Sequence, residues 1–505
     1  MVMWILILIW AALSLTVRTI YRLYFHPLAG IPGPKLTAAT HLVEFYHNVV
    51  RRGMFIWEIE KMHKQYGPIV RINPREIHIN DAHYYDEVYA SGARVRDKDP
   101  MATAMYSAPG AIVATVGHVQ HRARRRVMNP FFSKAAVTNL EPMIQEKITQ
   151  LIKRLEKSYR EQTVVELHTV FQGFTADVAT HHFYGSSYDF LEDDEFSRAI
   201  QEGIEAVTGT APINKLFPML GTVLGLLPPR ILTTLRPATA GIFRLQEMYI
   251  QKSLKALADS RRPGFASSYT RTNPFEALFD PAIHPEEKSL DRLLDQQMGL
   301  LGAGSESTTN TLTVAFFHLL QNKLIFWKLR RELCEIMPNP RSPVQWSKLE
   351  KLPYLSGVVN EALRLSFAGA SRFPRVAPEG ALTYRSYTIP AGTPVSISSY
   401  FVHMDPQIFP EPESFDPERW VRAAERGERL SKFIASFTKG TRVCLGINLA
   451  YAEIYTVIAA VVRNFELVLH ETTAEDVRFV RDLLAPRPRV GGWRVKARVI
   501  GVESE

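Results

Sequence analysis

The chain has 505 residues, of which 46% are hydrophobic, 22% charged and 10% aromatic, a composition that excludes a disordered, collagen-like or polytopic membrane protein. Its two cysteines, Cys334 and Cys444, are too few for a disulfide framework or a Cys₄ zinc site. The formal net charge of +9 is not concentrated in one run, so it favours an acidic protein partner or an anionic membrane surface over nucleic acid.

The amino terminus predicts a membrane anchor. Residues 1–17 carry no charged side chain, and nine of them are Ile, Leu or Val. The apolar and aromatic residues that follow bring the segment to the length of about 20 residues that a span needs. No basic residue precedes the run, whereas Arg18, Arg22 and Lys35 follow it, which favours a single span with a cytosolic body over a cleaved signal peptide or an apolar tail. We assign residues 1–23 to a transmembrane anchor.

A proline-rich segment follows the anchor and contains Ile31-Pro32-Gly33-Pro34. Proline fixes φ and cannot continue a helix. The segment is therefore either a stiff hinge that orients a globular body against the bilayer or a plain linker. We assign 24–40 to this hinge and 41–505 to one large body.

The body is predicted to be rich in helix, with small sheets and no internal repeat. Periodicity and proline positions define the expected elements. In chain order these are a hairpin over 69–80, amphipathic helices over 130–159 and 191–207, a surface connection over 262–288, a buried central helix over 293–320, short strands over 382–389 and 395–397, and a helix over 445–462.

Cys444 and its flanks carry a chemical signal. The predicted helix begins at this cysteine, so its free N–H groups and positive end would lower the pKa of the thiol. Gly440 and Gly446 let backbone approach a flat ligand, and Arg442 offers a charge for an acidic group. A lone cysteine is usually a buried structural thiol. These flanks favour instead a haem site, in which sulfur ligates iron and the guanidinium pairs with a propionate.

The segment from Phe437 to Gly446 reads F-x-x-G-x-R-x-C-x-G and resembles the haem-binding signature of the cytochrome P-450 family at all five fixed positions. The resemblance implies a mainly α fold with small β-sheets, in which 41–505 form a haem-thiolate catalytic domain. It implies haem b as the cofactor and Cys444 as the axial ligand of the iron. Phe437, Arg442 and Gly446 are then further cofactor-binding residues.

Two further segments resemble family motifs that hold the haem pocket together. Glu361-Ala362-Leu363-Arg364 resembles E-x-x-R, and Pro417-Glu418-Arg419-Trp420 resembles P-E-R-F. The i, i+3 spacing puts Glu361 and Arg364 on one helical face. The resemblance implies that Glu361, Arg364 and Arg419 form a buried ion network before the cysteine loop.

The predicted central helix contains Leu301-Gly302-Ala303-Gly304-Ser305-Glu306-Ser307-Thr308. Glycines and polar groups are costly in a buried helix, so in isolation this stretch also fits a packing spot or a kink. It resembles the family's oxygen-binding motif A-G-x-D/E-T-T, with Ser307 where the family usually has Thr. The resemblance implies that Ala303 and Gly304 leave room for dioxygen, and that Glu306, Ser307 and Thr308 relay protons to it.

The resemblance to the family also assigns residues around the cofactor and the substrate. His121 and Arg125 match the family's W-x-x-x-R segment, with His121 at the Trp position, and Arg375 matches a third propionate ligand. The expected substrate pocket is mostly apolar, which implies a hydrophobic substrate. Besides Ala303, its residues are Met105, Tyr106, Ile112, Val113, Leu300, Phe367, Ala368, Phe373 and Leu484.

The electron source is expected to be another protein, because the chain shows no G-x-G-x-x-G or Walker pattern for a nucleotide. The resemblance implies an NADPH-cytochrome P-450 reductase that supplies NADPH electrons through its flavins, with cytochrome b5 as an accessory donor. Lys432, Lys439 and Arg442 suggest that an acidic reductase docks on the cysteine face.

The stretch Y-F-H-P-L-A-G-I-P-G-P over 24–34 resembles fungal microsomal members, many of which serve secondary metabolism. We therefore expect a single-pass protein of the endoplasmic reticulum membrane with its body in the cytosol. The expected reaction inserts one oxygen atom of dioxygen into an apolar substrate, by hydroxylation or epoxidation, with a terpenoid as the favoured class. Two alternatives remain: a reductase-independent haem-thiolate isomerase or dehydratase, and a non-enzymatic haem-binding or membrane scaffold protein.

Overall fold

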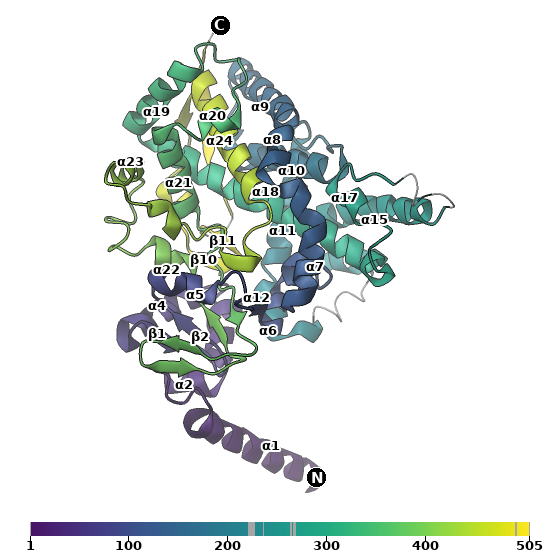
Figure 1. The fold of residues 1–505 in the computed structure, drawn as a ribbon, viewed down its shortest axis with the longest axis vertical. Helices are drawn as coiled ribbons and strands as arrows, with labels where there is room; N and C mark the ends of the chain where they lie inside the picture. The colour runs from purple at the N-terminus through teal and green to yellow at the C-terminus, as the bar shows by residue number, and fades with distance from the viewer. Residues whose placement is uncertain are drawn as a thin grey trace.

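The computed structural model describes residues 2–220, 228–235, 237–262, 265, 269–489 and 492–503. Figure 1 shows one α-rich body from which the N-terminal helix α1 (Val2–Ile20) projects. Helix labels follow Figure 1. The other helices of the described residues are α2 (Lys35–Ala39), α3 (Leu42–Phe45), α4 (Phe55–Tyr66), α5 (Tyr85–Val88), α6 (Pro100–Thr103), α7 (His118–Met128), α8 (Lys134–Asn139), α9 (Glu141–Glu161), α10 (Leu167–Tyr184), α11 (Asp194–Thr208), α12 (Ala211–Leu216), α14 (Pro229–Leu235), α15 (Ala240–Ser260), α17 (Pro274–Ala277), α18 (Leu290–Gln321), α19 (Lys323–Ile336), α20 (Trp346–Leu349), α21 (Pro353–Ser366), α22 (Ser399–His403), α23 (Glu418–Glu425) and α24 (Ile447–Asn464).

Helix α1 buries none of its residues against the body. It continues through a π-helical turn, and the combined apolar segment Val2–Phe25 has 24 residues. At 1.5 Å per residue this segment reaches about 36 Å, enough for a hydrocarbon core of about 30 Å. The structure thus contains the apolar N-terminal helix that the sequence predicts for an anchor.

The proline-rich segment after α1 is held against the body. The backbone N–H of Arg71 donates to the Pro32 carbonyl over 2.7 Å, and the Arg71 guanidinium donates to the Arg22 carbonyl over 2.8 Å. Arg22 in turn donates to the Ala39 carbonyl over 2.7 Å. A Cβ on Gly33 would lie 2.7 Å from the Arg71 oxygen, so glycine is needed for this approach. These contacts fix the segment to the body.

The strands form small sheets. The largest has the order β1-β2-β8-β5-β3, and its β1–β2 hairpin pairs Ile69 with Ile79 inside the predicted range. Strands β2 and β8 run parallel, and the other sheets are β4-β12-β9, β6-β7 and β10-β11. The strands are β1 (Ile69–Arg71), β2 (Ile77–Ile79), β3 (Asp97–Lys98), β4 (Val165–Glu166), β5 (Arg375–Val376), β6 (Leu382–Tyr384), β7 (Tyr387–Ile389), β8 (Pro394–Ser396), β9 (Phe465–Leu469), β10 (Arg481–Leu483), β11 (Ala485–Arg487) and β12 (Lys496–Val502).

The core surrounds α18, which crosses the middle of the body in Figure 1. This helix has 32 residues and most of them are buried. It begins after Ser289, whose side-chain oxygen accepts the backbone N–H of Arg292 over 3.4 Å as an N-cap. Helices α10, α21 and α24 pack against it. The predicted buried central helix is therefore present, with slightly wider bounds.

Two expected ranges differ from the structure. The helix predicted over 130–159 is divided at Leu140 into α8 and α9, because Ser133 caps α8 and a proline starts the next helix. The surface connection over 262–288 contains the short helix α17, and its residues 263, 264 and 266–268 lie outside the described residues.

Candidate active site

The cysteine loop is a closed structure that precedes α24. The N–H of Cys444 donates to the Phe437 carbonyl over 2.9 Å, and the N–H of Thr441 donates to the Ala90 carbonyl over 3.1 Å. Gly440 has φ of +74°, and a Cβ on it would collide with the backbone of Ala90. The glycine is required because the loop lies directly on another segment of backbone.

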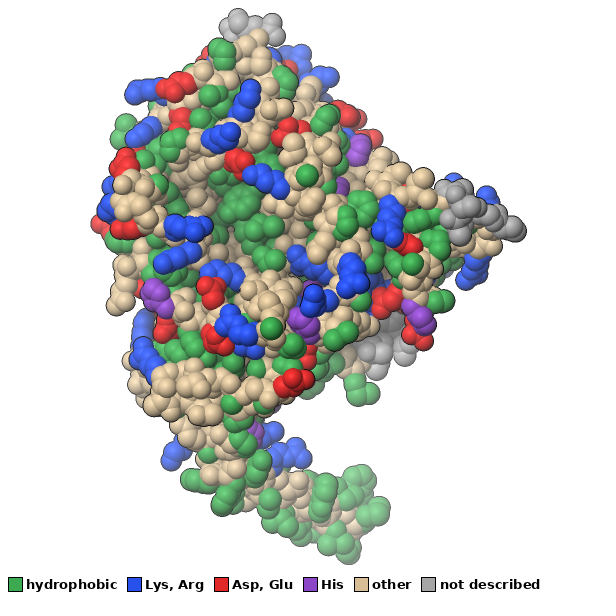
Figure 2. Space-filling model, viewed as in Figure 1, with side chains coloured by type: hydrophobic (Ala, Val, Ile, Leu, Met, Phe, Trp, Pro, Cys, Tyr) green, Lys and Arg blue, Asp and Glu red, His purple; other side chains and the backbone are tan. Residues whose placement is uncertain are grey.

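The thiol lies ahead of the helix and not at its first residue, which corrects the prediction. Helix α24 begins at Ile447, and Gly446 is its N-cap. The Gly446 N–H still hydrogen-bonds the sulfur of Cys444 and lowers the thiol's pKa, as does nearby Arg125, but burial is the larger effect and raises the pKa overall. The residue Cys444 is nevertheless exposed at the surface of the protein. Figure 2 shows a hollow with a hydrophobic floor near the middle of the face that it draws. Figure 1, in the same orientation, places α18, α21 and α24 there.

A cluster of basic side chains lies beside the cysteine loop. We call Lys98, His121, Arg125, Arg375 and Arg442 the cationic cluster. Arg442 donates to the carbonyls of Thr115 and Val116, both over 2.6 Å. Arg125 donates to the Val443 carbonyl and, over 3.4 Å, to the Cys444 carbonyl. Strands β3 and β5 pair Lys98 with Arg375.

Among the described residues the cationic cluster forms no ion pair with an acid, although Asp97 raises the pKa of Arg442 from a larger distance. Burial, followed by the repulsion of Arg375, lowers the pKa of Arg442 to about 10. Burial and the surrounding cations lower the pKa of His121 to about 2 and that of Lys98 well below its usual value. Buried His121 Nδ1 and Arg442 Nε also have no hydrogen-bond partner in the described structure.

Lys98 is the member that the sequence analysis missed. No motif marks it, and only the pairing of β3 with β5 brings it beside Arg375. Its ammonium donates to the Val113 carbonyl and lies 5.3 Å from the centre of the Tyr106 ring.

The predicted ion network is assembled at buried positions. Glu361 and Arg364 are both fully buried, and Arg364 Nε donates to Glu361 over 2.5 Å. Arg419 donates to the other Glu361 oxygen. Arg364 also donates to the carbonyls of His403 over 3.1 Å and Ser414 over 2.9 Å. The network thus fixes the irregular segment that leads to the cysteine loop.

The structure divides the predicted oxygen-binding residues between two sides of α18. Ala303 is exposed and Ser307 half-buried in this otherwise buried helix, and Ser307 Oγ donates to the Ala303 carbonyl over 3.0 Å. Gly304 faces α10, where an added Cβ would lie 3.3 Å from Ala179, so its small size serves helix packing. Thr308 is buried. The 3.6-residue period explains why neighbours in the motif face different surroundings.

Glu306 is buried and forms an ion pair with Arg487 of β11. Arg487 also donates to the Thr208 hydroxyl at the end of α11 over 2.8 Å. Burial raises the pKa of Glu306, while Arg487 opposes that rise. The sequence analysis missed Arg487, because nothing in a three-residue strand far along the chain marks it as a partner of α18.

Most predicted pocket residues fall into neighbouring groups. Met105, Tyr106 and Leu484 form one apolar cluster with Ala102 and Ala211. Met105, Tyr106 and Phe373 also line a small cavity with members of the cationic cluster. The remaining residues Ile112, Val113, Leu300 and Ala368 lie near α18 or at the end of α21.

The structure places Phe367 apart from the other predicted pocket residues. Phe367 follows the last residue of α21 with φ of +48°, and this left-handed conformation turns its ring into a separate core cluster. Its ring centre lies 5.3 Å from those of Tyr400 and Phe479. Helix periodicity could not predict this placement, because it depends on how the helix ends.

A second buried set of charges was also not predicted. We call Glu44, Glu76, Lys215 and Arg372 the buried quartet. Lys215 Nζ lies 2.7 Å from Glu44 and 3.5 Å from Glu76, and Arg372 lies 2.5 Å and 3.0 Å from the same two carboxylates. The quartet joins the segment after the hinge, the β1–β2 hairpin, α12 and the loop before β5.

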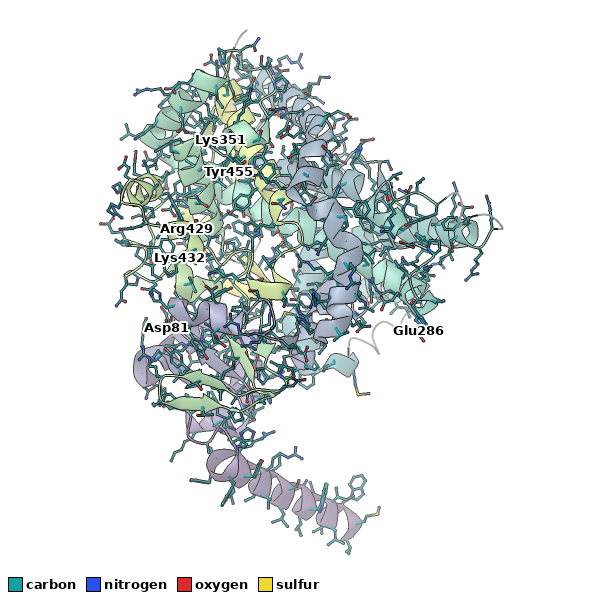
Figure 3. The ribbon with its side chains drawn as sticks, in the orientation of Figure 1. Asp81, Glu286, Lys351, Arg429, Lys432 and Tyr455 are labelled. Atoms are coloured by element: carbon teal, nitrogen blue, oxygen red, sulfur yellow. The ribbon has the colours of Figure 1, made fainter. Side chains whose placement is uncertain are left out.

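The predicted docking residues are not equally available. Arg442 is buried, and Lys439 pairs with Asp86 over 2.8 Å. Lys432 is exposed, and Figure 3 shows it next to Arg429 on the face that carries the hollow of Figure 2. Burial therefore removes Arg442 from a docking surface, whereas Lys432 and Arg429 remain.

Comparisons with known proteins agree with this site. The family model for cytochrome P-450 matches residues 32–490. The cytochrome P-450 monooxygenase aflU of Aspergillus parasiticus is 42% identical over 98% of both chains. Conidiogenone synthase PchP450 of Penicillium rubens is 43% identical over 94% of this chain and 95% of its own, and the cytochrome P-450 monooxygenase TRI4 of Trichoderma arundinaceum is 41% identical over 95% and 92%.

A solved structure shows the same fold. The retinoic acid-bound cyanobacterial P-450 matches with a TM-score of 0.65, over 87% of this chain and 93% of its own, at 21% identity. The chain belongs to the cytochrome P-450 family. It is a cytochrome P-450 monooxygenase whose relatives at about 40% identity are fungal enzymes.

The family implies a haem-thiolate cofactor, and the residues present fit one. The exposed Cys444 offers the thiolate. The cationic cluster, with its unpartnered His121 and Arg442 nitrogens, offers donors for an acidic group such as a propionate. Membership of the family also implies a redox partner and a small-molecule substrate.

Proposed function

We propose that this chain is a membrane-anchored, reductase-dependent monooxygenase of fungal secondary metabolism that inserts one oxygen atom of dioxygen into an apolar substrate. The observation that carries the proposal is the accessible Cys444 beside a cationic cluster without a carboxylate partner in the described structure. Haem b, when bound, supplies the binding and activation of dioxygen.

The residues of this chain hold and orient the cofactor. Cys444 ligates its iron, and the Gly446 N–H stabilises the thiolate. Lys98, His121, Arg375 and Arg442 pair with its propionates. Arg125 is half-buried and binds the carbonyls of the cysteine loop, so it orients the loop as well as adding positive charge. Phe437 accepts the Cys444 N–H at its carbonyl and closes the loop.

The proton path uses α18. Ser307 is the hydroxyl on the accessible side of this helix, next to Ala303, and it is therefore the final donor toward dioxygen. Glu306 supplies protons to this side. Thr308 is buried and supports the helix.

The substrate is proposed to be an apolar molecule such as a terpenoid. The support is the apolar cluster of Met105, Tyr106 and Leu484, with Phe373 beside it. Hydroxylation and epoxidation both fit a pocket that binds by shape and offers few polar groups.

The membrane and partner assignments complete the proposal. Residues 1–23 anchor the chain in the endoplasmic reticulum, 24–40 form the hinge, and 41–505 form the catalytic domain in the cytosol. NADPH-cytochrome P-450 reductase, with cytochrome b5 as an accessory donor, docks on the face where Lys432 and Arg429 lie (Figure 3).

The test is the absorption spectrum of the dithionite-reduced, carbon monoxide-bound protein. We expect a strongly red-shifted thiolate-type Soret band that Cys444→Ser abolishes. Cys334→Ser, which changes the other cysteine on α19, should leave the band unchanged. An imidazole-type band in folded wild-type protein would overturn the proposed ligand. Product formation without NADPH would instead support the isomerase alternative.

A further inference from the structure

Glu306 does not stand alone on α18 but belongs to a buried contact between three elements. Its carboxylate pairs with Arg487 of β11, and Arg487 donates to Thr208 at the end of α11 over 2.8 Å. Both Glu306 and Arg487 are more than nine-tenths buried. A buried pair of this kind holds its members firmly, because separating them leaves a charge without a partner.

The same strand is connected to the substrate pocket. Arg487 lies three residues beyond Leu484, the turn residue between β10 and β11, and these strands stand next to α11 and α12 in Figure 1. Leu484 packs in the apolar cluster with Met105 and Ala211. Its φ of +69° is a left-handed conformation that is strained for a leucine. The tip of the hairpin is thus a strained residue in contact with the pocket wall.

Two titratable groups, Glu205 and His168, lie close to the pair of Glu306 and Arg487. Glu205 on α11 raises the pKa of Glu306, and Arg487 lowers it. His168 on α10 is also close enough for Arg487 to lower its pKa, and burial brings that pKa to about 3, so this histidine is neutral. Arg487 is therefore the cation that balances Glu306.

We propose that Arg487 is a positioning residue that couples occupancy of the pocket to release of the Glu306 carboxyl. A ligand that fills the pocket moves Leu484, the hairpin carries Arg487 away from α18, and Glu306 becomes free to pass protons toward Ser307. In the structure the pair holds Glu306 toward β11. This inference rests on the proposed function, because it assigns the timing of the same proton path.

Thermodynamic coupling between the ion pair and ligand binding predicts the direction in which ligand affinity must change. If filling the pocket weakens the pair, then removing the pair must strengthen the binding of a ligand that fills the pocket. A ligand too small to reach Leu484 must be unaffected. Clotrimazole and imidazole are suitable probes, because both bind haem iron and shift its spectrum while only clotrimazole is bulky.

The experiment titrates both azoles into the full-length haem protein carrying Arg487→Met. We expect clotrimazole to bind at least about fivefold more tightly than to wild type, with imidazole affinity unchanged. The matched control is Arg489→Met, two residues away, which removes an exposed arginine paired with Asp476 and should change neither affinity. Leu484→Ala should abolish the effect of Arg487→Met, because it removes the contact that transmits it.

Unchanged or weaker clotrimazole binding, an equal change for both azoles, or an effect that persists with Leu484→Ala would each overturn the proposal. If Arg487→Met does not fold, Glu306→Gln breaks the same pair with little change of shape and must give the same tightening. Arg487→Lys keeps the charge and should restore much of the wild-type behaviour.

A second measurement does not require haem. Without Arg487, the pKa of Glu306 rises further, because a cation that lowered it is gone. A carboxyl whose folded pKa lies above its unfolded pKa loses stability as pH rises. The free energy of unfolding of Arg487→Met should therefore fall as pH rises above about 4.5, more steeply than in wild type, and adding Glu306→Gln should remove that slope. This measurement tests the pair even if the haem spectrum contradicts the proposed function.

Discussion

The buried quartet and the cationic cluster are two groups of buried ionisable side chains that differ in how their charges are balanced. The quartet places two carboxylates against two cations, and its cations lower the pKa of Glu44 well below its usual range, while the carboxylates hold the pKa of Arg372 above its usual value. The cationic cluster has only positive or neutral members, and the pKa values of Lys98, His121 and Arg442 are all lowered. The first group is satisfied within the protein, and the second fits an anionic ligand.

The largest expected effect comes from breaking the balance of the quartet. Arg372→Met leaves two buried carboxylates facing one ammonium, so the free energy of unfolding should fall by about 3–5 kcal/mol. Urea denaturation of the full chain measures this. The matched control is Arg426→Met, which removes an exposed arginine from its pair with Glu428 and should have no resolvable effect. Equal stability of Arg372→Met and wild type would show that the quartet is not a structural ion network.

The second effect is the pH dependence of the cationic cluster. The folded protein holds His121 neutral with a pKa of about 2, against about 6.5 in the unfolded chain. Stability is therefore lost as pH falls below about 6.5, because the unfolded chain binds a proton that the folded one does not. His121→Gln should remove at most about 2 kcal/mol of the loss between pH 6.5 and pH 5.

The comparison for this slope is His284→Gln, which changes an exposed histidine. This variant should keep the slope that His121→Gln removes. The carboxylates of the quartet act in a different range: their lowered pKa values predict that their contribution is present above about pH 4.5 and lost below it. A slope that His121→Gln leaves intact would contradict the buried neutral state of this residue.

The third effect separates stability from cofactor binding. Lys98→Met removes a cation that its neighbours repel, so the haem-free protein should keep its stability within about 1 kcal/mol. The same change removes a charge-assisted partner for a propionate, so haem loss should be about tenfold faster. Transfer of haem to apomyoglobin measures the rate. A large loss of stability in the haem-free protein, with unchanged haem loss, would make Lys98 a structural residue.

The smallest effect concerns one hydrogen bond of the quartet. Ser396 Oγ donates to the Glu76 carboxylate over 3.0 Å in a fully buried position. Ser396→Ala should lower the free energy of unfolding by about 1 kcal/mol, because the carboxylate keeps its two cations and its amide donor Asn73. Urea denaturation of this variant beside Arg372→Met ranks the members of the quartet. A loss as large as that of Arg372→Met would mean that this single hydrogen bond stabilises the quartet as much as an ion pair does.

Residues within one short motif were predictable from the sequence. Phe437, Arg442, Cys444 and Gly446 lie within ten residues, so the motif itself brings them together. Glu361 and Arg364 share a helical face for the same reason, and the apolar alternation around Asn73-Pro74 predicted a hairpin that the structure contains.

Residues whose partners lie far along the chain were not predictable. The quartet joins Glu44 and Glu76 to Lys215 and Arg372 across more than a hundred residues each, and Glu306 meets Arg487 from a distant strand. A single helical end decided that Phe367 faces the core, and one helix contact decided that Gly304 faces α10.

The sequence by itself therefore determined the family, the cysteine motif, the apolar N-terminal helix and the helical core, because local spacing and apolar periodicity encode them. Only the tertiary structure decided which charges balance one another. Coulomb interactions and desolvation depend on distance and burial, and neither is set until strands β3, β5 and β11 and helices α11, α12 and α18 come together.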